Sequence, residues 1–290
     1  MKTTGFSFIR NALIYDYPIV EAITSILPIC DEFVIAVGKS DDDTYQLIDS
    51  IDRKKIRIID TIWDEDLREG GRALAQETDK AFAEVSEDTD WAFYIQGDEV
   101  IHEKYLDVID ENMRRYKDDL IVDGLLFQYL HFYGSFDYVG TSSKWYRNEI
   151  RIIRNDKSIY SYRDAQGFRK KDNEKLKVKP VNACVYHYGW VKEPKAMQKK
   201  QENFNKYWHD DKWIDKNIFK AEEFDYTRNL SSLKVFEGTH PKVMQKRIEA
   251  KNWKFDYDIS FNKTGCKDKM KTLLRNYLGL DFSYRNYQIV

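Results

Sequence analysis

The chain has 290 residues and a formal net charge of −2, which excludes a dedicated nucleic-acid binder because such proteins normally carry a marked basic excess. Its 42% hydrophobic and 33% charged residues are typical of a folded globular protein and exclude a disordered one. No apolar run reaches the length of a membrane-spanning helix, and the first residues show no signal-peptide pattern.

The first hundred residues alternate between strand and helix patterns. Continuous apolar runs predict buried strands over residues 5–10, 32–37, 56–59 and 91–95. Apolar positions at helical spacing predict the intervening helices over residues 17–27, 45–51 and 72–85. Strands and helices that alternate at this spacing predict an α/β fold with a mostly parallel sheet and right-handed crossovers.

Acidic side chains follow two of these strands. Residues 96–99, Gln-Gly-Asp-Glu, come directly after one strand, and three successive aspartates at 41–43 lie in the loop after another. One aspartate is enough to cap the next helix, whereas three adjacent negative charges repel one another unless a ligand shares them. Because open α/β sheets bind ligands at the carboxyl ends of their strands, we expect both segments at one ligand-binding edge.

Later strands carry basic side chains and a histidine. Residues 125–133 and 145–154 have strand patterns, and the second contains Arg147 and Arg151. These arginines suit a phosphate group, or they form a solvated face.

The chain has no GxGxxG motif after its first strand and no GxxxxGK(S/T) motif, which argues against dinucleotide cofactors and P-loop chemistry.

In the order of these features the chain resembles a family 2 glycosyltransferase of the GT-A fold. The matching segments are the dipeptide 10–11 (Arg-Asn) after the first strand, residues 25–38, and the loop 40–44, which is similar to the family's GS-x-DGT segment. Residues 96–99 occupy the place of the family's DXD motif as a QxDE variant. The resemblance spans roughly residues 5 to 190 and is strongest over the first hundred.

The resemblance implies a nucleotide-sugar donor, with a UDP-sugar favoured, and a divalent metal, Mn²⁺ or Mg²⁺. Such a cation would neutralise the charge that builds on the diphosphate as the sugar leaves. It implies metal ligands at Asp98, Glu99 and His187, although Gln96 replaces the first acid of the motif and a histidine between tyrosines is usually a core residue. The donor contacts that we expect are Arg10, Asn11, Asp41, Asp42, Asp43, Gln96, Arg147 and Arg151.

A general base is expected in the polar segment 161–169, where the resembled fold carries it. The acceptor hydroxyl must lose a proton as it attacks the anomeric carbon, and a positioned carboxylate accepts that proton. Asp164 is the first candidate and Asp137 the second. The alternative for Asp164 is a turn-capping acid or an ion-pair partner of a neighbouring arginine.

The chain divides into a GT-A catalytic domain over residues 1–192 and a mainly helical extension over 193–290 that we expect to pack on it. Residues 267–278 have a basic amphipathic pattern, which indicates either contact with an anionic membrane surface or a solvated face. Cys30, Cys184 and Cys266 are widely spaced and form no CxxC motif, which predicts a reducing compartment. We therefore expect a cytoplasmic protein, with the inner face of the membrane as an alternative site.

These patterns predict an inverting, metal-assisted glycosyltransferase of polysaccharide or glycan biosynthesis, with a glycan or lipid-linked acceptor and no nucleic-acid partner. One alternative is a catalytically inactive relative that binds a nucleotide sugar or glycan, which Gln96 favours. Another is a nucleotidyltransferase with a similar sheet, which the lack of a basic phosphate-binding loop after the first strand disfavours.

Overall fold

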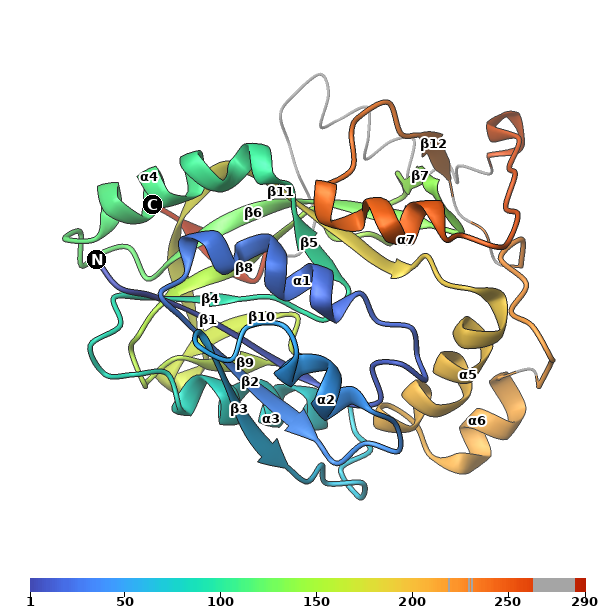
Figure 1. Ribbon diagram of the computed structural model, residues 1–290, viewed down its shortest axis with the longest axis horizontal. Coiled ribbons are helices and arrows are strands. Elements are labelled where there is room, and N and C mark those ends of the chain that lie inside the picture. Colours follow the sequence, from blue (N-terminus) through green and yellow to red (C-terminus); the bar gives the residue numbers. More distant parts are fainter. Residues whose placement is uncertain (219, 229, 231, 263–284) are drawn as a thin grey trace.

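The computed structural model describes residues 1–218, 220–228, 230, 232–262 and 285–290 (Figure 1). The helix expected at 267–278 and Cys266 lie outside these residues, so both stay predictions. Within the described part of the chain, no helix combines the length and the apolar composition needed to cross a membrane.

Strands and helices alternate through the first 116 residues and then give way to a run of strands. The strands are β1 Thr3–Ile9, β2 Glu32–Gly38, β3 Ile56–Thr61, β4 Trp91–Tyr94, β5 Glu99–Ile101, β6 Gly124–Tyr133, β7 Ser135–Gly140, β8 Asn148–Arg154, β9 Tyr160–Tyr162, β10 Gly167–Lys170, β11 Glu174–Trp190, β12 Leu233–Val235 and β13 Tyr287–Ile289. The helices are α1 Ile19–Ile26, α2 Thr44–Asp49, α3 Arg72–Ala83, α4 Leu106–Tyr116, α5 Pro194–Phe204, α6 Asp211–Asn217 and α7 Gln245–Glu249.

One sheet connects these strands in the order β3-β2-β1-β4-β8-β6-β11-β10-β9. The strands β3, β2, β1 and β4 are parallel, as the alternation of the first hundred residues predicts. β8 then runs antiparallel to both β4 and β6, and β6 runs parallel to β11. The protein is therefore a mixed α/β fold, which confirms the predicted α/β class.

Helices cover both faces of this sheet (Figure 1). Successive residues of β4 point to opposite faces, so Trp91 and Phe93 pack with α1 and α4 while Ala92 and Tyr94 pack with α3. All four side chains have no exposed surface, which explains the unbroken apolar run. Burying one such aromatic ring contributes about 1.5–3 kcal/mol, so β4 is firmly held up to the residue where its polar segment begins.

The segment after residue 193 is helical at first and then returns to the sheet. β12 pairs antiparallel with β7, and β13 pairs parallel with β11, so this segment contributes two short strands that the sequence patterns do not predict. Both strands are three residues long, too short for a periodic signal. The boundary between residues 192 and 193 stays a prediction.

Candidate active site

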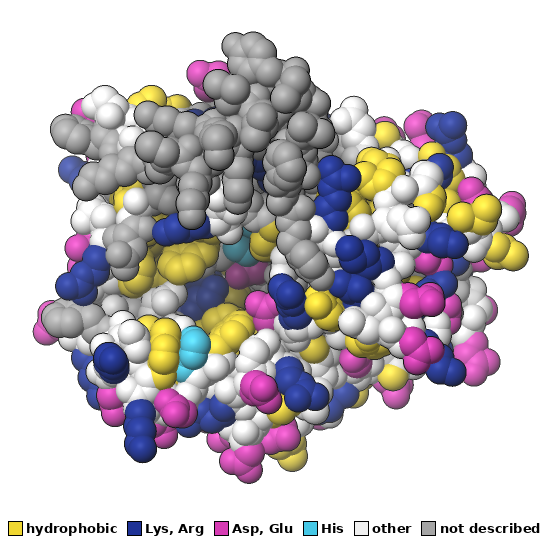
Figure 2. All heavy atoms as spheres, turned by 180° about the vertical axis from the view of Figure 1, so that it is seen from behind, with side chains coloured by type: hydrophobic (Ala, Val, Ile, Leu, Met, Phe, Trp, Pro, Cys, Tyr) yellow, Lys and Arg dark blue, Asp and Glu magenta, His cyan; other side chains and the backbone are white. Residues whose placement is uncertain are grey.

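A pocket of about 700 Å³ opens at the edge of the sheet where β1, β4 and β11 end. Aromatic side chains form much of its wall, including Tyr15, Tyr17, Trp63, Trp145, Trp190 and Trp208. Figure 2 shows the face seen from behind, which is hollowed near its centre where hydrophobic, basic, acidic and histidine side chains meet. This edge is the ligand-binding position that the strand order predicts.

Asp98 lines the pocket in the turn between β4 and β5. Its Oδ2 lies 3.4 Å from the Nζ atom of Lys200 on α5, and its Oδ1 lies 3.7 Å from Nε2 of His187 on β11. Burial acts to raise the pKa of Asp98, but nearby positive charge, Lys200 first, lowers that pKa to about 2. Burial lowers the pKa of His187 and so disfavours its protonated form, which leaves the Lys200 amine as the main ion-pair partner of Asp98.

Gly189 allows Asp98 and His187 to approach each other. A Cβ atom at Gly189 would lie 2.7 Å from Asp98 Oδ2 and 2.6 Å from His187 Cε1, so no larger residue fits there without movement. The backbone N–H of Tyr188 donates to the Asp98 carbonyl oxygen at 2.8 Å and ties β11 to the turn. The sequence 187–189 therefore shapes the position of Asp98 through its backbone as well as through its histidine.

Glu99, the adjacent carboxylate, does not line the pocket. It is fully buried, and it accepts hydrogen bonds from Arg151 Nε at 2.8 Å and Arg151 Nη2 at 2.7 Å. The Tyr129 hydroxyl and the Gln96 backbone N–H also donate to it, at 2.8 and 3.1 Å. Arg151 is itself only 1% exposed, so this expected donor contact is instead the counter-ion of an expected metal ligand. The bidentate pair of Glu99 and Arg151 holds the turn between β4 and β5 in place beneath the wall of the pocket.

The expected metal ligands do not form a site that fits a divalent cation. Such a cation takes about six ligands, chiefly oxygens. Glu99 is bound by Arg151, Gln96 donates its amide, and Asp98 faces an ammonium, so the remaining donor is His187. Among the residues that the structure describes, no group of three or more His, Cys, Asp and Glu side chains could hold a metal ion. The expectation of a metal at this motif is therefore at odds with the donor set.

A hydrogen bond of the Gln96 side chain explains why the motif begins with an amide rather than an acid. Its Nε2 donates to the Ala165 carbonyl oxygen at 2.9 Å, a bond that an ionised aspartate could not make. Arg163 and Ala165 have φ values of 57° and 61°, so this carbonyl belongs to a tight loop in a conformation that needs support. The loop carries Asp164, which lines the pocket together with Gln96.

Asp164 lies half-buried in the pocket wall, against the start of α3. A Cβ atom at Gly71 would lie 2.5 Å from the Cβ of Asp164 and 2.9 Å from the Trp208 ring, so the glycine makes room for both side chains. Burial raises the pKa of Asp164 above its ordinary value. The Asp164 side chain nevertheless lines the pocket.

Two loops after β1 and β2 lie against each other beside the pocket. The Asp42 carboxylate accepts from the backbone N–H groups of Leu13 and Ile14 at 3.0 and 2.9 Å, and the Asn11 side chain accepts from the backbone N–H of Asp41 at 2.8 Å. Neither Asn11 nor residues 41–43 line the pocket, so in this structure the acids hold the loops together. The expected donor contact that does line the pocket here is Arg10, whose Nη2 lies 2.9 Å from Glu65 Oε1.

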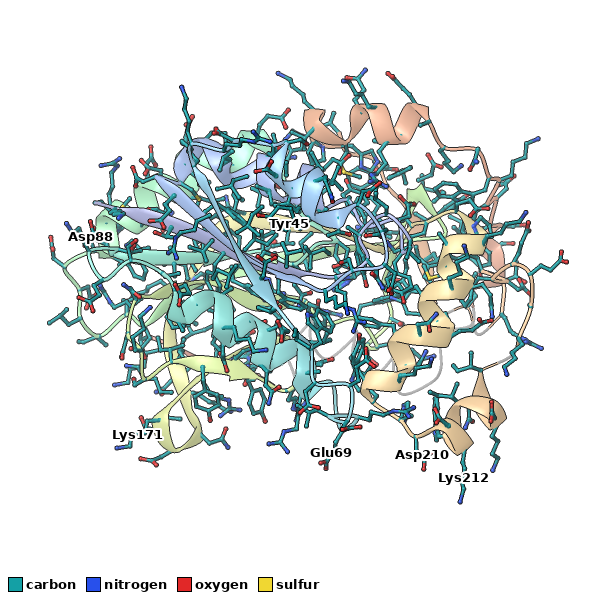
Figure 3. All side chains as sticks on the ribbon, turned by 60° about the horizontal axis from the view of Figure 1, so that its bottom comes forward. Tyr45, Glu69, Asp88, Lys171, Asp210 and Lys212 are labelled. Carbon is teal, nitrogen blue, oxygen red and sulfur yellow. The ribbon has the colours of Figure 1, made fainter. Side chains whose placement is uncertain are left out.

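Of the other expected site residues, one lines the pocket and one lies outside it. Arg147 lines the pocket. Asp137 does not line it; this residue is exposed on β7 and accepts a hydrogen bond from the Ser135 hydroxyl. Side chains near the ends of α3 and α6, such as Glu69 and Asp210, point outward from the molecule (Figure 3). The charged residues that bear on the pocket are therefore a small subset of those present.

Lys200 and Glu149 are among the pocket residues that the sequence patterns do not single out. Lys200 follows Met197 by three residues and precedes Phe204 by four, so a lysine on the buried face of a helix was the available signal. Glu149 alternates with the arginines of β8, and nothing in its local pattern separates it from a solvated acid.

Comparison with known proteins identifies no family for this chain. No protein-family model matches the chain, and no curated protein sequence matches it. S. aureus TarS 1–349 in complex with UDP-GlcNAc is 14% identical over 77% of this chain and 68% of that chain, with a TM-score of 0.39. Glucosyl-3-phosphoglycerate synthase from Mycobacterium tuberculosis, in complex with Mn²⁺, UDP-Glc and phosphoglyceric acid, is 16% identical over 45% of this chain and 44% of that chain, with a TM-score of 0.30.

A third similar structure has a different named activity. The 4-diphosphocytidyl-2C-methyl-D-erythritol synthase from Anaerococcus prevotii is 12% identical over 66% of this chain and 89% of that chain, with a TM-score of 0.37. These three structures have different named activities, and likeness at these levels assigns none of them to this chain.

Proposed function

We propose that the protein is a glycosyltransferase that moves a sugar from a nucleotide-sugar donor to an acceptor hydroxyl. The charge of the pocket carries this proposal. Among the residues that the structure describes, five basic and three acidic side chains line it, namely Arg10, Lys144, Arg147, Arg163 and Lys200 against Asp98, Glu149 and Asp164. Burial raises the pKa of Glu149 to about 8, so this carboxyl is largely uncharged at pH 7 and the positive excess grows. A diphosphate has the charge that such a pocket attracts.

The volume and the walls of the pocket suit the rest of such a donor. Pockets that bind small molecules measure about 300–1,000 Å³, and this one, at about 700 Å³, lies within that range. Trp63, Trp145, Trp190 and Trp208 offer flat apolar surfaces on which a base or a sugar ring packs. We assign the nucleoside to the side of Arg10 and the diphosphate to the side of Asp98 and Arg147.

Asp164 is the proposed general base in a single displacement. The acceptor oxygen forms a bond to the anomeric carbon and transfers its proton to the Asp164 carboxylate. The bond from that carbon to the diphosphate oxygen breaks, and its electron pair stays on the nucleoside diphosphate. One displacement of this kind inverts the anomeric configuration, and the raised pKa of Asp164 makes it the stronger base.

The acceptor in this proposal is a glycan or a lipid-linked glycan, so the reaction belongs to polysaccharide or glycan biosynthesis. The support is the aromatic wall, since sugar rings pack their apolar faces on aromatic side chains. A UDP-sugar is the first donor to test, with GDP- and CMP-sugars as alternatives.

The test begins with a panel of UDP-, GDP- and CMP-sugars in a thermal-shift assay, because a ligand that binds the folded state raises its melting temperature. Release of nucleotide from the best donor is then measured for the wild type and for Asp164→Asn. We expect the variant to lose at least about a hundredfold in rate. Asp137→Asn, which changes an acid outside the pocket, serves as the matched control and should keep the wild-type rate.

Three outcomes distinguish an active glycosyltransferase from an inactive nucleotide-sugar-binding protein and from a protein of another function. Donor binding with turnover that needs Asp164 supports the proposal. Tight binding of a nucleotide sugar without turnover supports the inactive relative instead. If no nucleotide sugar in the panel raises the melting temperature, the proposed function is refuted.

A further inference from the structure

The ammonium of Lys200 lies inside the pocket next to Asp98. Its Nζ is 3.4 Å from Asp98 Oδ2 and donates to the Gly189 carbonyl oxygen at 3.2 Å. The same atom lies 5.0 Å from the centre of the Tyr17 ring and 5.3 Å from that of Phe204. Lys200 is only 8% exposed and still lines the pocket, so a fixed positive charge faces the space where a donor would bind.

This charge stands beside the carboxylate that would otherwise bind a cation. Within the described ranges, the remaining oxygens and nitrogens around Asp98 are too few for a metal, since Glu99 is engaged by Arg151 and the Gln96 amide by the Ala165 carbonyl. A divalent cation bound to Asp98 would also lie close to the Lys200 ammonium, and like charges in a partly buried site repel strongly. The disagreement between the donor set and the metal expected from the motif therefore has a specific cause.

We propose that Lys200 neutralises the diphosphate of the donor in place of a divalent metal, so that the protein binds nucleoside diphosphates without one. This inference rests on the proposed function and concerns the same pocket. A lysine ammonium has three N–H donors. Asp98 and the Gly189 carbonyl take two of them within the described chain, which leaves the third to point at a phosphate oxygen.

Lys200 then acts on the leaving group. When the bond from the anomeric carbon to the diphosphate oxygen breaks, the electron pair stays on that oxygen and the diphosphate gains negative charge. An ammonium that is already held in position stabilises this charge without reorganising at the moment of reaction. Asp98 is a positioning residue in this scheme, because it holds Lys200 rather than a metal.

A second lysine reinforces the arrangement. Lys192 is fully buried, donates to the Asp16 carbonyl oxygen at 2.6 Å and lies 4.3 Å from the centre of the Tyr17 ring. The Tyr17 ring lies beside both lysine amines, and its negative face favours their charged forms. Burial lowers the pKa of Lys192 to about 7, so this lysine is only partly charged at pH 7, and Lys200 is the one that lines the pocket.

The test is calorimetric titration with UDP, first in EDTA and then in excess MnCl₂. If UDP does not bind, GDP and CDP are titrated in the same two buffers. We expect the wild type to bind the nucleotide with affinities that agree within about twofold in the two buffers. Lys200→Met should lose at least about tenfold in EDTA, because a charge-assisted contact is removed. Lys199→Met, which changes the exposed neighbour on the same helix, should bind as the wild type does.

Binding that disappears in EDTA would overturn the inference while leaving the proposed function in place. Wild-type affinity of Lys200→Met in EDTA would overturn it as well. If Lys200→Met fails to fold, the wild-type comparison between EDTA and MnCl₂ decides the question, and Lys200→Arg, which keeps the charge, should bind in EDTA. Failure of UDP, GDP and CDP to bind in either buffer would overturn this inference, and the panel of nucleotide sugars then decides the proposed function separately.

Discussion

Asp98 and Glu99 are neighbours in sequence and lie in two regions with different uses. Asp98 faces the pocket, next to the Lys200 ammonium and His187. Glu99 lies beneath the pocket, where Arg151 and Tyr129 satisfy both of its oxygens. The difference shows that an acidic pair at the end of a strand can serve two purposes at once, since one carboxylate is presented to a ligand and the other secures the turn that presents it.

The largest expected effect is a loss of stability when the buried pair of Glu99 and Arg151 is broken. Glu99→Gln leaves the Arg151 guanidinium buried without a counter-ion, and breaking a buried pair on one side costs about 3–5 kcal/mol of unfolding free energy. Urea unfolding measures this loss. Asp88→Asn is the control, because Asp88 lies at the outer edge of the molecule (Figure 3) and pairs with Lys2 at the surface. The control should lose less than about 1 kcal/mol, and equal losses would contradict the structural role of Glu99.

The next effect distinguishes Asp98, which faces the pocket, from the buried Glu99. Asp98→Asn keeps the shape of the side chain and removes the charge that holds Lys200. We expect transfer to fall at least about a hundredfold, while the unfolding free energy falls by only about 1–3 kcal/mol. Nucleotide release from the donor and urea unfolding of the same preparation measure the two quantities. Normal turnover by this variant would show that Asp98 is not part of the site.

Glu149 extends the comparison to a third buried carboxyl. Within the described chain its Oε1 accepts from Gln166 and its Oε2 has no hydrogen-bond partner. Burial outweighs the opposing charge of Arg151 and raises the pKa of Glu149 from 4.5 to about 8.

Between these two pKa values the folded state keeps a proton that the unfolded state has lost. The unfolding free energy should therefore fall as pH rises through this window, by up to about 1.4 kcal/mol per pH unit. Urea unfolding at a series of pH values measures the slope. Glu149→Gln should flatten it, and an unchanged slope in the variant would assign the effect to another group.

The smallest effect concerns Gln96, which connects the buried Glu99 with the loop that carries Asp164. Its backbone N–H donates to Glu99, and its side chain donates to the Ala165 carbonyl beside Asp164. Gln96→Leu should cost about 1 kcal/mol of unfolding free energy and roughly tenfold in kcat, because the loop of the proposed base is held less firmly. Gln245→Leu, at an exposed position on α7, is the control. Unchanged kcat in Gln96→Leu would show that the Ala165 hydrogen bond does not position Asp164.

Local patterns predicted much of the fold and part of the site. The runs at 32–37 and 91–95 became β2 and β4 within one residue at each end, because buried parallel strands need continuous apolar sequence. The position of Asp98 at the ligand-binding edge followed from the same run and the general rule for open sheets. The short strands β12 and β13 were beyond prediction, since three residues carry no period.

The amino-acid sequence alone determined the strands β1 to β4, their parallel direction, and the acidic turn after β4. Only the tertiary structure decided what that turn faces. Arg151 lies 52 residues from Glu99, and Lys200 lies 102 residues from Asp98. Periodicity reports which face of an element is buried, whereas the partner of a buried charge depends on which distant elements the sheet and α5 bring together. For that reason the sequence predicted a metal beside Asp98, and the fold placed a lysine there.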